Sequence, residues 1–269
     1  MQVMVIGASG MAGHMIVKYL RQQGYAVRAV DRNVLDLEDT LAVTNYFKYL
    51  SQLPDVIINC AGILVKASID NPGLAYRINT KFPHFLEETF ALTRTQVIHI
   101  STDCVFDGLR GNYVETDEKT ETNSYGASKA RGEIVNDKDV TFRMSIIGPE
   151  LKTHATGLLT WMLTTEQTTL QGWTNAWWNG ITTLQLAKCL DLHLRTRIIT
   201  GIYHLVNNNF CITKYDLLNK INDIYSLNKI IEPQENPKKI NKILVDTRQL
   251  VDFCIPDYDT QLIELRDFK

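Results

Sequence analysis

The chain has 269 residues, of which 45% are hydrophobic and 22% charged, with 15 glycines and 7 prolines, a balance typical of globular proteins that excludes collagen-like, coiled-coil and disordered classes. Lys and Arg total 28 against 30 Asp and Glu, a net charge of −2, and the longest basic run is Lys238–Lys239; we therefore expect no nucleic-acid partner, whose phosphates require clustered cations. At about 150 residues per domain, the length predicts one or two domains.

The cysteines and the amino terminus indicate the compartment. The five cysteines form an odd set without a C-x-x-C pair, so neither a disulfide framework nor a zinc knuckle is predicted. The six histidines lack metal-ligand spacing, and we expect no metal; His99 is expected in the core with its hydrogen bonds satisfied. No signal-peptide pattern follows Met1, and no stretch approaches the roughly 20 apolar residues that a bilayer span needs. We expect a cytoplasmic protein without a membrane span.

In the first half of the chain, short apolar runs alternate with longer amphipathic stretches, which is the pattern of βαβ units. Strands are expected at residues 2–6, 25–30, 55–59, 96–101 and 139–143. Helices are expected near residues 13–22, 38–51, 72–91 and 124–137, the third interrupted at Pro83. Because such connections are right-handed, the pattern predicts an α/β fold with a Rossmann-type doubly wound parallel sheet.

After Pro149 the pattern changes. Helices are expected near residues 155–166, 181–196 and 213–227, a Trp-rich loop at 172–180 and a Pro-punctuated tail at 233–237. This part is too short and too strand-poor to look independent. We predict a first domain over residues 1–148 and a smaller lobe over 149–269, packed on the carboxyl edge of the sheet, with a soft boundary that the chain can cross again.

A glycine-rich segment follows the first strand directly and opens the first helix. Its expected ligand-binding residues are Gly7, Ser9, Gly10, Met11 and Gly13. The glycines permit a tight turn, a close approach of the backbone to a pyrophosphate and close contact between helix and strand. The amino terminus of the helix offers free N–H groups to the phosphates. The segment predicts a first domain that binds NAD or NADP.

An acidic and a basic residue follow the second strand. Asp31 can accept hydrogen bonds from an adenosine ribose, whereas the adjacent Arg32 can hold a 2′-phosphate. Together they leave the choice between NADH and NADPH open.

Tyr125 and Lys129 stand four residues apart in a segment that is expected to be helical, so both side chains project from one face. A nearby ammonium lowers the pKa of a phenol by favouring the phenolate, and we expect Lys129 to do this for Tyr125. Tyr125 can then exchange a proton with a carbonyl oxygen. Thr102, at the end of the fourth strand, can position the same oxygen. These three residues are the predicted catalytic group, and Tyr125 and Lys129 are also expected to contact the cofactor.

Three segments resemble the extended short-chain dehydrogenase/reductase superfamily, and within it the dTDP-4-dehydrorhamnose reductase group. They are residues 7–13 (GASGMAG), residues 29–37 (AVDRNVLDL) and residues 101–108 (STDCVFDG), the last leading through Tyr113, Glu115 and Asp117 to residues 124–129 (SYGASK). The resemblance covers roughly residues 1–150. It implies an NADPH- or NADH-dependent reductase of a nucleotide sugar, with Thr102, Tyr125 and Lys129 as its catalytic trio.

The resemblance also implies further site residues. Asp36 and Leu37 would flank the adenine, and Cys60, Ala61 and Gly62 would line the cofactor site after the third strand. Asp103, Cys104 and Val105 are expected beside the substrate. Related 4,6-dehydratases have an acidic pair after the threonine, so Cys104 in the second of these positions argues against dehydration. The same position usually holds an aromatic residue in the reductases, which leaves the identity of the sugar open.

An aromatic and amide-rich loop in the second half is a candidate substrate contact. Its candidate residues are Trp173, Asn175 and Trp177. Such side chains can stack on a nucleobase and bond to sugar hydroxyls, although aromatic clusters also serve packing alone.

The sequence therefore predicts reduction of a 4-keto-6-deoxy sugar on a nucleoside diphosphate, for surface polysaccharide synthesis. Two alternatives stay open at this point: an epimerase or dehydrogenase on the same scaffold, and a non-catalytic NAD(P)-binding regulatory subunit. The nucleotide, the product stereochemistry and the oligomeric state, including a homodimer, are also open.

Overall fold

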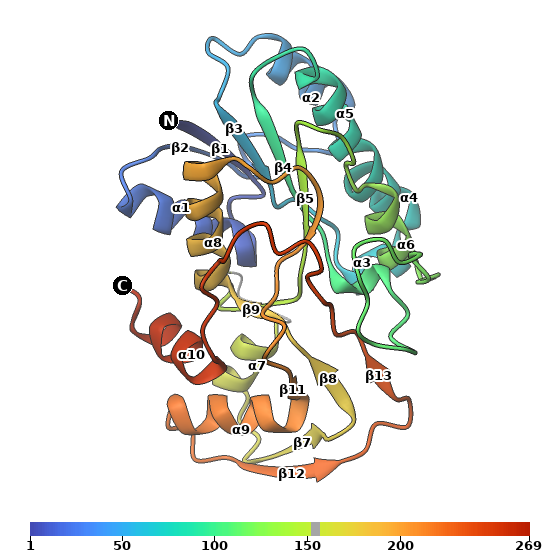
Figure 1. Ribbon diagram of the computed structural model, residues 1–269, viewed down its shortest axis with the longest axis vertical. Helices are drawn as coiled ribbons and strands as arrows, with labels where there is room; N and C mark the ends of the chain where they lie inside the picture. Colours follow the sequence, from blue (N-terminus) through green and yellow to red (C-terminus); the bar gives the residue numbers. More distant parts are fainter. Residues whose placement is uncertain (152–156) are drawn as a thin grey trace.

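The computed structural model describes residues 1–151 and 157–269, and its largest feature is a six-stranded parallel sheet (Figure 1). Across the sheet the strands are β10 (Gly201–His204), β5 (Val140–Arg143), β4 (Gln96–Ile100), β3 (Val56–Asn59), β1 (Gln2–Ile6) and β2 (Ala26–Val30). The strand order reverses between β1 and β3, which is where doubly wound sheets open a crevice for ligands. The predicted α/β fold is confirmed.

The apolar runs explain the central strands. All four residues of β3 and all five of β4 are buried, as expected for parallel strands covered by helices on both faces. The five predicted strands are confirmed to within one residue at each end. The edge strand β10 was not predicted, because its sequence Gly-Ile-Tyr-His is short and half-buried at its start.

Helices cover both faces of the sheet (Figure 1). On one face, α1 (Met11–Gln22) packs beside α8 (Thr183–Thr196) against alternate residues of β1 such as Val3 and Val5. On the other face, α2 (Thr40–Lys48) and α5 (Phe82–Phe90) pack against the intervening residues Met4 and Ile6. The alternation of side chains along one strand therefore supplies two separate cores.

The predicted helix at residues 72–91 is divided into three parts. It consists of α4 (Pro72–Ala75), a π-helical turn (Tyr76–Lys81) and α5, with Pro83 in the first turn of α5. The predicted interruption at Pro83 is therefore confirmed, since proline cannot donate the backbone bond that would continue a regular helix. Within the π-helical turn, the buried Asn79 donates to the Ser128 hydroxyl of α6 (Ser124–Arg131) at 3.0 Å. The short helix α3 (Val65–Asp70) precedes these elements.

The second half of the chain contains more strand than the sequence indicates. Its elements are β6 (Ile146–Ile147), α7 (Leu158–Thr164), β7 (Thr169–Trp173), β8 (Ala176–Trp178), β9 (Ile181–Thr182), β11 (Ile212–Thr213), α9 (Lys214–Ile224), β12 (Ile230–Gln234), β13 (Ile240–Asn241) and α10 (Tyr258–Asp267). The expectation of few strands is wrong, because strands of two to five residues leave little periodic signal. The expected loop 172–180 instead contains the end of β7 and all of β8, and the tail at 233–237 begins within β12. The start of the helix predicted at 155–166 lies outside the described residues.

The second half both forms a lobe and returns to the central sheet. Trp178 of β8 donates through Nε1 to the Ser145 hydroxyl, directly after β5, at 2.8 Å. The small β11-β8-β13 sheet therefore lies at the carboxyl end of the central sheet, on the side where the lobe was expected. Two elements of the second half, α8 and β10, pack with the first half, so the chain crosses the predicted boundary again. The division into two domains at residue 148 stays a prediction.

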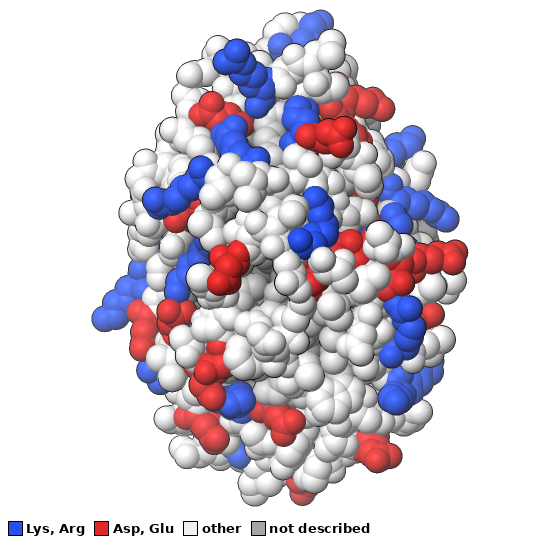
Figure 2. Space-filling model, viewed as in Figure 1, with Lys and Arg blue, Asp and Glu red and all other residues white. Residues whose placement is uncertain are grey.

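The surface carries charges of both signs. Figure 2 shows Lys and Arg side chains interspersed with Asp and Glu side chains over the visible face. Among the described residues, no helix is both long enough and apolar enough to span a bilayer.

Candidate active site

The glycine segment forms a cradle between β1 and α1. Gly7 has a φ of +78°, and a Cβ at this position would lie 2.8 Å from the backbone nitrogen of Ala61. A Cβ at Gly13 would overlap the Gly7 carbonyl oxygen, so neither position accepts a larger residue. Gly10 is the N-cap of α1 and has no side chain to cap the helix, which leaves the N–H groups of the first turn directed out of the helix end. This geometry fits a dinucleotide phosphate.

The segment after β3 closes the other side of the cradle. Cys60 donates its backbone N–H to the Ile6 carbonyl at 2.9 Å, and the N–H of Ala61 bonds to Asn59 Oδ1 at 3.2 Å. A Cβ on Gly62 would be 3.4 Å from Asn79 Oδ1. Residues 60–62 therefore lie beside the glycine segment, as a shared cofactor site requires. Burial raises the pKa of the Cys60 thiol to about 12, so this thiol stays protonated.

The acidic and basic residues after β2 are held by local bonds. Asp31 Oδ1 accepts the backbone N–H groups of Asn33 and Val34 at 3.0 and 3.2 Å. Arg32, with 71% of its side chain exposed, pairs with Glu38 at 2.6 Å and Asp36 at 3.4 Å. The cation that could hold a 2′-phosphate is thus already engaged by two carboxylates. Leu37 packs at the edge of the nearby apolar core.

Thr102 and Tyr125 are brought together by a close approach of α6 to the end of β4. Thr102 caps the short 3-10 turn Asp103–Val105 and accepts the N–H of Cys104 at 3.1 Å. A Cβ on Gly126 would overlap the Cys104 carbonyl oxygen, so only glycine lets α6 come this near. The Tyr125 phenol lies close enough to the Thr102 hydroxyl for this hydroxyl to lower the pKa of the phenol.

The protonation of Tyr125 differs from the sequence-based expectation. Burial raises its pKa above the ordinary value, with the charges of Cys104 and Asp103 adding to the rise and the bond to Thr102 opposing it. The expectation that Lys129 lowers this pKa is wrong for this state of the protein. The reason is geometric: Lys129 is directed toward β4, where Nζ donates to the Ile100 carbonyl at 2.7 Å. Tyr125 is therefore protonated at neutral pH.

Lys129 is a buried amine. Burial lowers its pKa to about 8, against the opposing effects of Glu133 and Cys60. Its nitrogen also lies 3.4 Å from His99 Nε2. His99, as expected, is a fully buried residue with hydrogen-bond partners on both ring nitrogens.

The residues after Thr102 have different environments. Asp103 is buried and accepts the Thr102 hydroxyl at 3.1 Å; burial raises its pKa while the lysines 242 and 214 oppose the rise. Burial raises the pKa of the Cys104 thiol to about 12. Val105 was expected beside the substrate, but it is fully buried in a core cluster with Phe106 and is not at a pocket surface.

Two lysines that the sequence did not single out face this end of β4. Lys214, the first residue of α9, places Nζ 4.7 Å from the centre of the Trp178 ring. Lys242 pairs with Glu121 at 3.2 Å. The charges of both lysines act on Asp103, and each lysine also interacts with the Cys104 thiol. Because they come from segments more than 100 residues away along the chain, no local pattern could have identified them.

The aromatic segment is only partly placed for a substrate role. Trp173 and Trp177 are 44% and 38% exposed. The amide of Asn175 is engaged with the backbone of Asn236, donating at 2.9 Å and accepting at 2.8 Å, so it fixes the loop. Trp173 lines a surface groove with Trp161, and none of Thr102, Tyr125 and Lys129 lines that groove.

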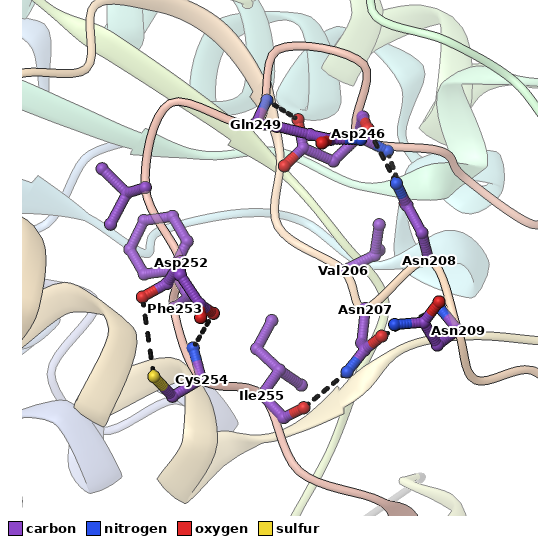
Figure 3. Close-up of a pocket in the computed structure, with 11 residues that line it drawn as sticks. Val206, Asn207, Asn208, Asn209, Asp246, Gln249, Asp252, Phe253, Cys254 and Ile255 are labelled. Atoms are coloured by element: carbon purple, nitrogen blue, oxygen red, sulfur yellow. Dashed lines mark hydrogen bonds between the residues drawn. The ribbon is translucent and has the colours of Figure 1, made fainter.

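A second cavity, of about 420 Å³, lies between the segment after β10 and the loop 246–255 (Figure 3). Its polar side chains mostly bond to the loop itself: Asn208 and Asp246 exchange two hydrogen bonds of 2.8 Å, and Asn207 donates to the Ile255 carbonyl at 2.6 Å. None of the three predicted catalytic residues lines this cavity. Among the described residues, no group of three or more His, Cys, Asp or Glu side chains is arranged to hold a metal ion.

Comparison with known proteins gives a consistent set of relatives. A family model described as "RmlD substrate binding domain" matches residues 1–243. The dTDP-4-dehydrorhamnose reductase of Aggregatibacter actinomycetemcomitans is 35% identical over 141 residues, which cover 49% of this chain and 45% of that protein. A probable low-salt glycan biosynthesis reductase of Haloferax volcanii is 32% identical over 163 residues, covering 55% and 54%. The chain spans about half the length of the curated relatives that it matches.

Solved structures share the fold over nearly the whole chain. A dTDP-4-dehydrorhamnose reductase from Clostridium acetobutylicum superposes with a TM-score of 0.86 at 23% identity, covering 99% of both chains. One from Bacillus anthracis, in complex with NADP, gives a TM-score of 0.84 at 21% identity, covering 98% of both. At this level of identity, the likeness establishes the fold.

Proposed function

The chain belongs to the RmlD substrate binding domain family, and from that premise we propose that it reduces a 4-keto-6-deoxy sugar carried on a nucleoside diphosphate, with NADPH or NADH as reductant. The proposal is a reaction of the dTDP-4-dehydrorhamnose reductase type, serving surface polysaccharide synthesis. The observation that carries it is the Tyr125 side chain, which lies beside Thr102 at the carboxyl end of β4, in a sheet whose neighbouring strands β1 and β3 end in the glycine cradle.

The glycine cradle and residues 60–62 would hold the dinucleotide, whose reduced nicotinamide supplies the hydride. Tyr125 would give its proton to the sugar's carbonyl oxygen as the carbonyl carbon accepts that hydride. Its raised pKa keeps the phenol protonated at neutral pH, which suits a proton donor. Thr102 would hold the same oxygen in place through its hydroxyl.

The two lysines of the second half supply positive charge where an anionic substrate would enter. Lys214 and Lys242 lie close enough to oppose the raised pKa of Asp103. Cations of this kind suit a diphosphate, which carries negative charge at every physiological pH. We infer that they contribute to binding of the nucleotide part of the substrate.

We place the reaction in the cytoplasm, where reduced nicotinamides and nucleotide sugars are available. All five cysteines are free thiols, as a reducing compartment favours. A homodimer remains a prediction, which light scattering on the purified protein would measure.

A panel of nucleoside-diphosphate keto sugars tests the proposal, each incubated with the protein and NADPH or NADH while the nicotinamide absorbance is followed. Steady loss of the reduced cofactor with one sugar is the expected result. An unchanged absorbance with conversion of the sugar would indicate epimerisation. Binding of cofactor without conversion of any sugar would indicate a regulatory subunit, and either outcome would contradict the proposal.

A further inference from the structure

A chain of three buried polar side chains lies beneath the catalytic helix. Asn59 ends β3, His99 lies in β4 and Lys129 reaches down from α6; their exposed fractions are 0%, 0% and 4%. Asn59 Nδ2 is 3.2 Å from His99 Nδ1, and His99 Nε2 is 3.4 Å from Lys129 Nζ. Because all three side chains are buried, the polar atoms that face one another have to be matched as donor and acceptor.

The orientation of the Asn59 amide determines the tautomer of His99. Asn59 Oδ1 accepts the backbone N–H of Ala61 at 3.2 Å, so the NH₂ group of the amide is the part that faces His99. An NH₂ group only donates, and His99 Nδ1 must therefore accept. The imidazole is neutral, because burial and the nearby charges of Lys129 and His84 lower its pKa well below the ordinary value. Its one ring proton is then on Nε2.

This proton is directed at Lys129. The Nε2–H group can donate a hydrogen bond to the lone pair of an uncharged amine. An ammonium has no lone pair, so it cannot accept this bond and the two donors repel each other. The other partner of Nζ is the Ile100 carbonyl, which accepts a proton from either form of the amine. The remaining titratable groups that act on Lys129 are Glu133, two residues beyond the end of α6, and Cys60, directly after β3. Glu133 favours the ammonium but is shared with the Arg143 guanidinium at 2.8 Å.

We propose that Asn59 and His99 are positioning residues that hold Lys129 through an Nε2–H tautomer and favour its uncharged form, so that Lys129 can exchange protons with the active site near neutral pH. The inference rests on the proposed function for its catalytic meaning. The hydrogen-bond arrangement itself is a property of the protein without substrate. Its test can therefore be separated from the test of the reaction.

The tautomer is measured directly by NMR of the histidine ring nitrogens in ¹⁵N-labelled protein. We expect His99 to show a protonated Nε2 and an unprotonated Nδ1, without titration, from about pH 6 to about pH 9. A protonated Nδ1, or a doubly protonated ring in this range, would overturn the proposal. This experiment needs neither a variant nor a substrate.

The effect on Lys129 is measured with His99→Leu, which removes the N–H that faces the amine. The titration of the Lys129 side chain, followed by NMR, should move upward by about one pH unit. If the protein reduces a keto sugar, the fall of kcat/KM at high pH should move upward by the same amount. The matched control is His193→Leu, since His193 is also fully buried but bonds to Gln96 far from the trio. It should lower stability and leave both pH dependences unchanged.

An unchanged Lys129 titration in folded His99→Leu would overturn the proposal. If His99→Leu does not fold, Asn59→Leu provides the second variant, because it frees Nδ1 to take the proton and lets Nε2 accept from the ammonium. The Lys129 titration should again move upward, and a downward shift or no shift would contradict the proposed arrangement. Failure of every keto sugar to react would remove the reductase assignment while leaving these NMR results interpretable.

Discussion

Tyr125 is a partly buried phenol whose hydroxyl lies beside Thr102, and burial raises its pKa above the ordinary value. Lys129, one helical turn away on the same face of α6, donates its Nζ proton to the Ile100 carbonyl at the end of β4. In the protein without substrate, Tyr125 and Lys129 therefore differ in protonation. Tyr125 keeps its proton, while Lys129, with a pKa of about 8, is the group poised to exchange one.

Lys214 gives a residue-scale prediction for substrate binding. Burial lowers its pKa from 10.5 to about 8, which Asp103 and Cys104 partly oppose, so its charge is present below about pH 8 and lost above. The KM for the nucleotide sugar should therefore rise as pH increases through this value. Lys214→Met should raise KM at neutral pH by about 10-fold or more and remove this part of the pH dependence. Steady-state kinetics across pH measure both effects, and Lys229→Met, outside the site, is the control. An unaltered KM in Lys214→Met would exclude a contact with the substrate.

Glu38 gives a second prediction at this scale, for cofactor preference. Because Glu38 holds Arg32 at 2.6 Å, Glu38→Gln should free the guanidinium for the 2′-phosphate. The KM for NADPH should fall by about threefold relative to that for NADH, as expected for release of an exposed ion pair. In an Arg32→Ala background, Glu38→Gln should no longer change the ratio of the two KM values. Equal KM ratios in wild type and Glu38→Gln would show that Arg32 does not contact the cofactor.

At the scale of elements, the site depends on how closely α6 packs on the turn after Thr102. Gly126→Ala should force α6 away from the Cys104 carbonyl oxygen, with a loss of about 1–3 kcal/mol in the free energy of unfolding and a fall in kcat of at least about 10-fold. Gly73→Ala is the control, because its Cβ would lie 3.6 Å from Asn71 Oδ1, an ordinary contact. Urea unfolding and kinetics measure both. Full activity in Gly126→Ala would show that this approach does not position Tyr125.

The elements also show which parts of the fold a sequence can predict. The runs that form β1, β3 and β4 are continuous, apolar and followed by turn signals, and their positions were predicted to within a residue. Strands such as β10 and β8 are only four and three residues long; β8 alternates between buried and exposed positions, and β10 is half-buried over its first two residues. Their positions depend on pairing partners far away in the chain, which local patterns do not contain.

At the scale of the whole molecule, the candidate active site also combines residues that a local sequence pattern predicts with residues that only the folded structure brings together. Thr102, Tyr125 and the glycine segment were predicted because each belongs to one contiguous pattern. The environment of Lys129 could not be predicted in this way. Asn59 and His99 come from different strands and reach Lys129 only once the sheet has formed. Lys214 was not predicted for the same reason, because it comes from the lobe formed by the second half of the chain.

The most direct test of the central claim compares Tyr125→Phe with Tyr225→Phe in the reduction of the keto sugar that the panel identifies. Tyr225 also precedes a lysine by four residues but lies at the end of α9, away from the trio. The account predicts that kcat falls by about 10²- to 10⁴-fold in Tyr125→Phe, with cofactor affinity retained, and is unchanged in Tyr225→Phe. Wild-type turnover by folded Tyr125→Phe would contradict it.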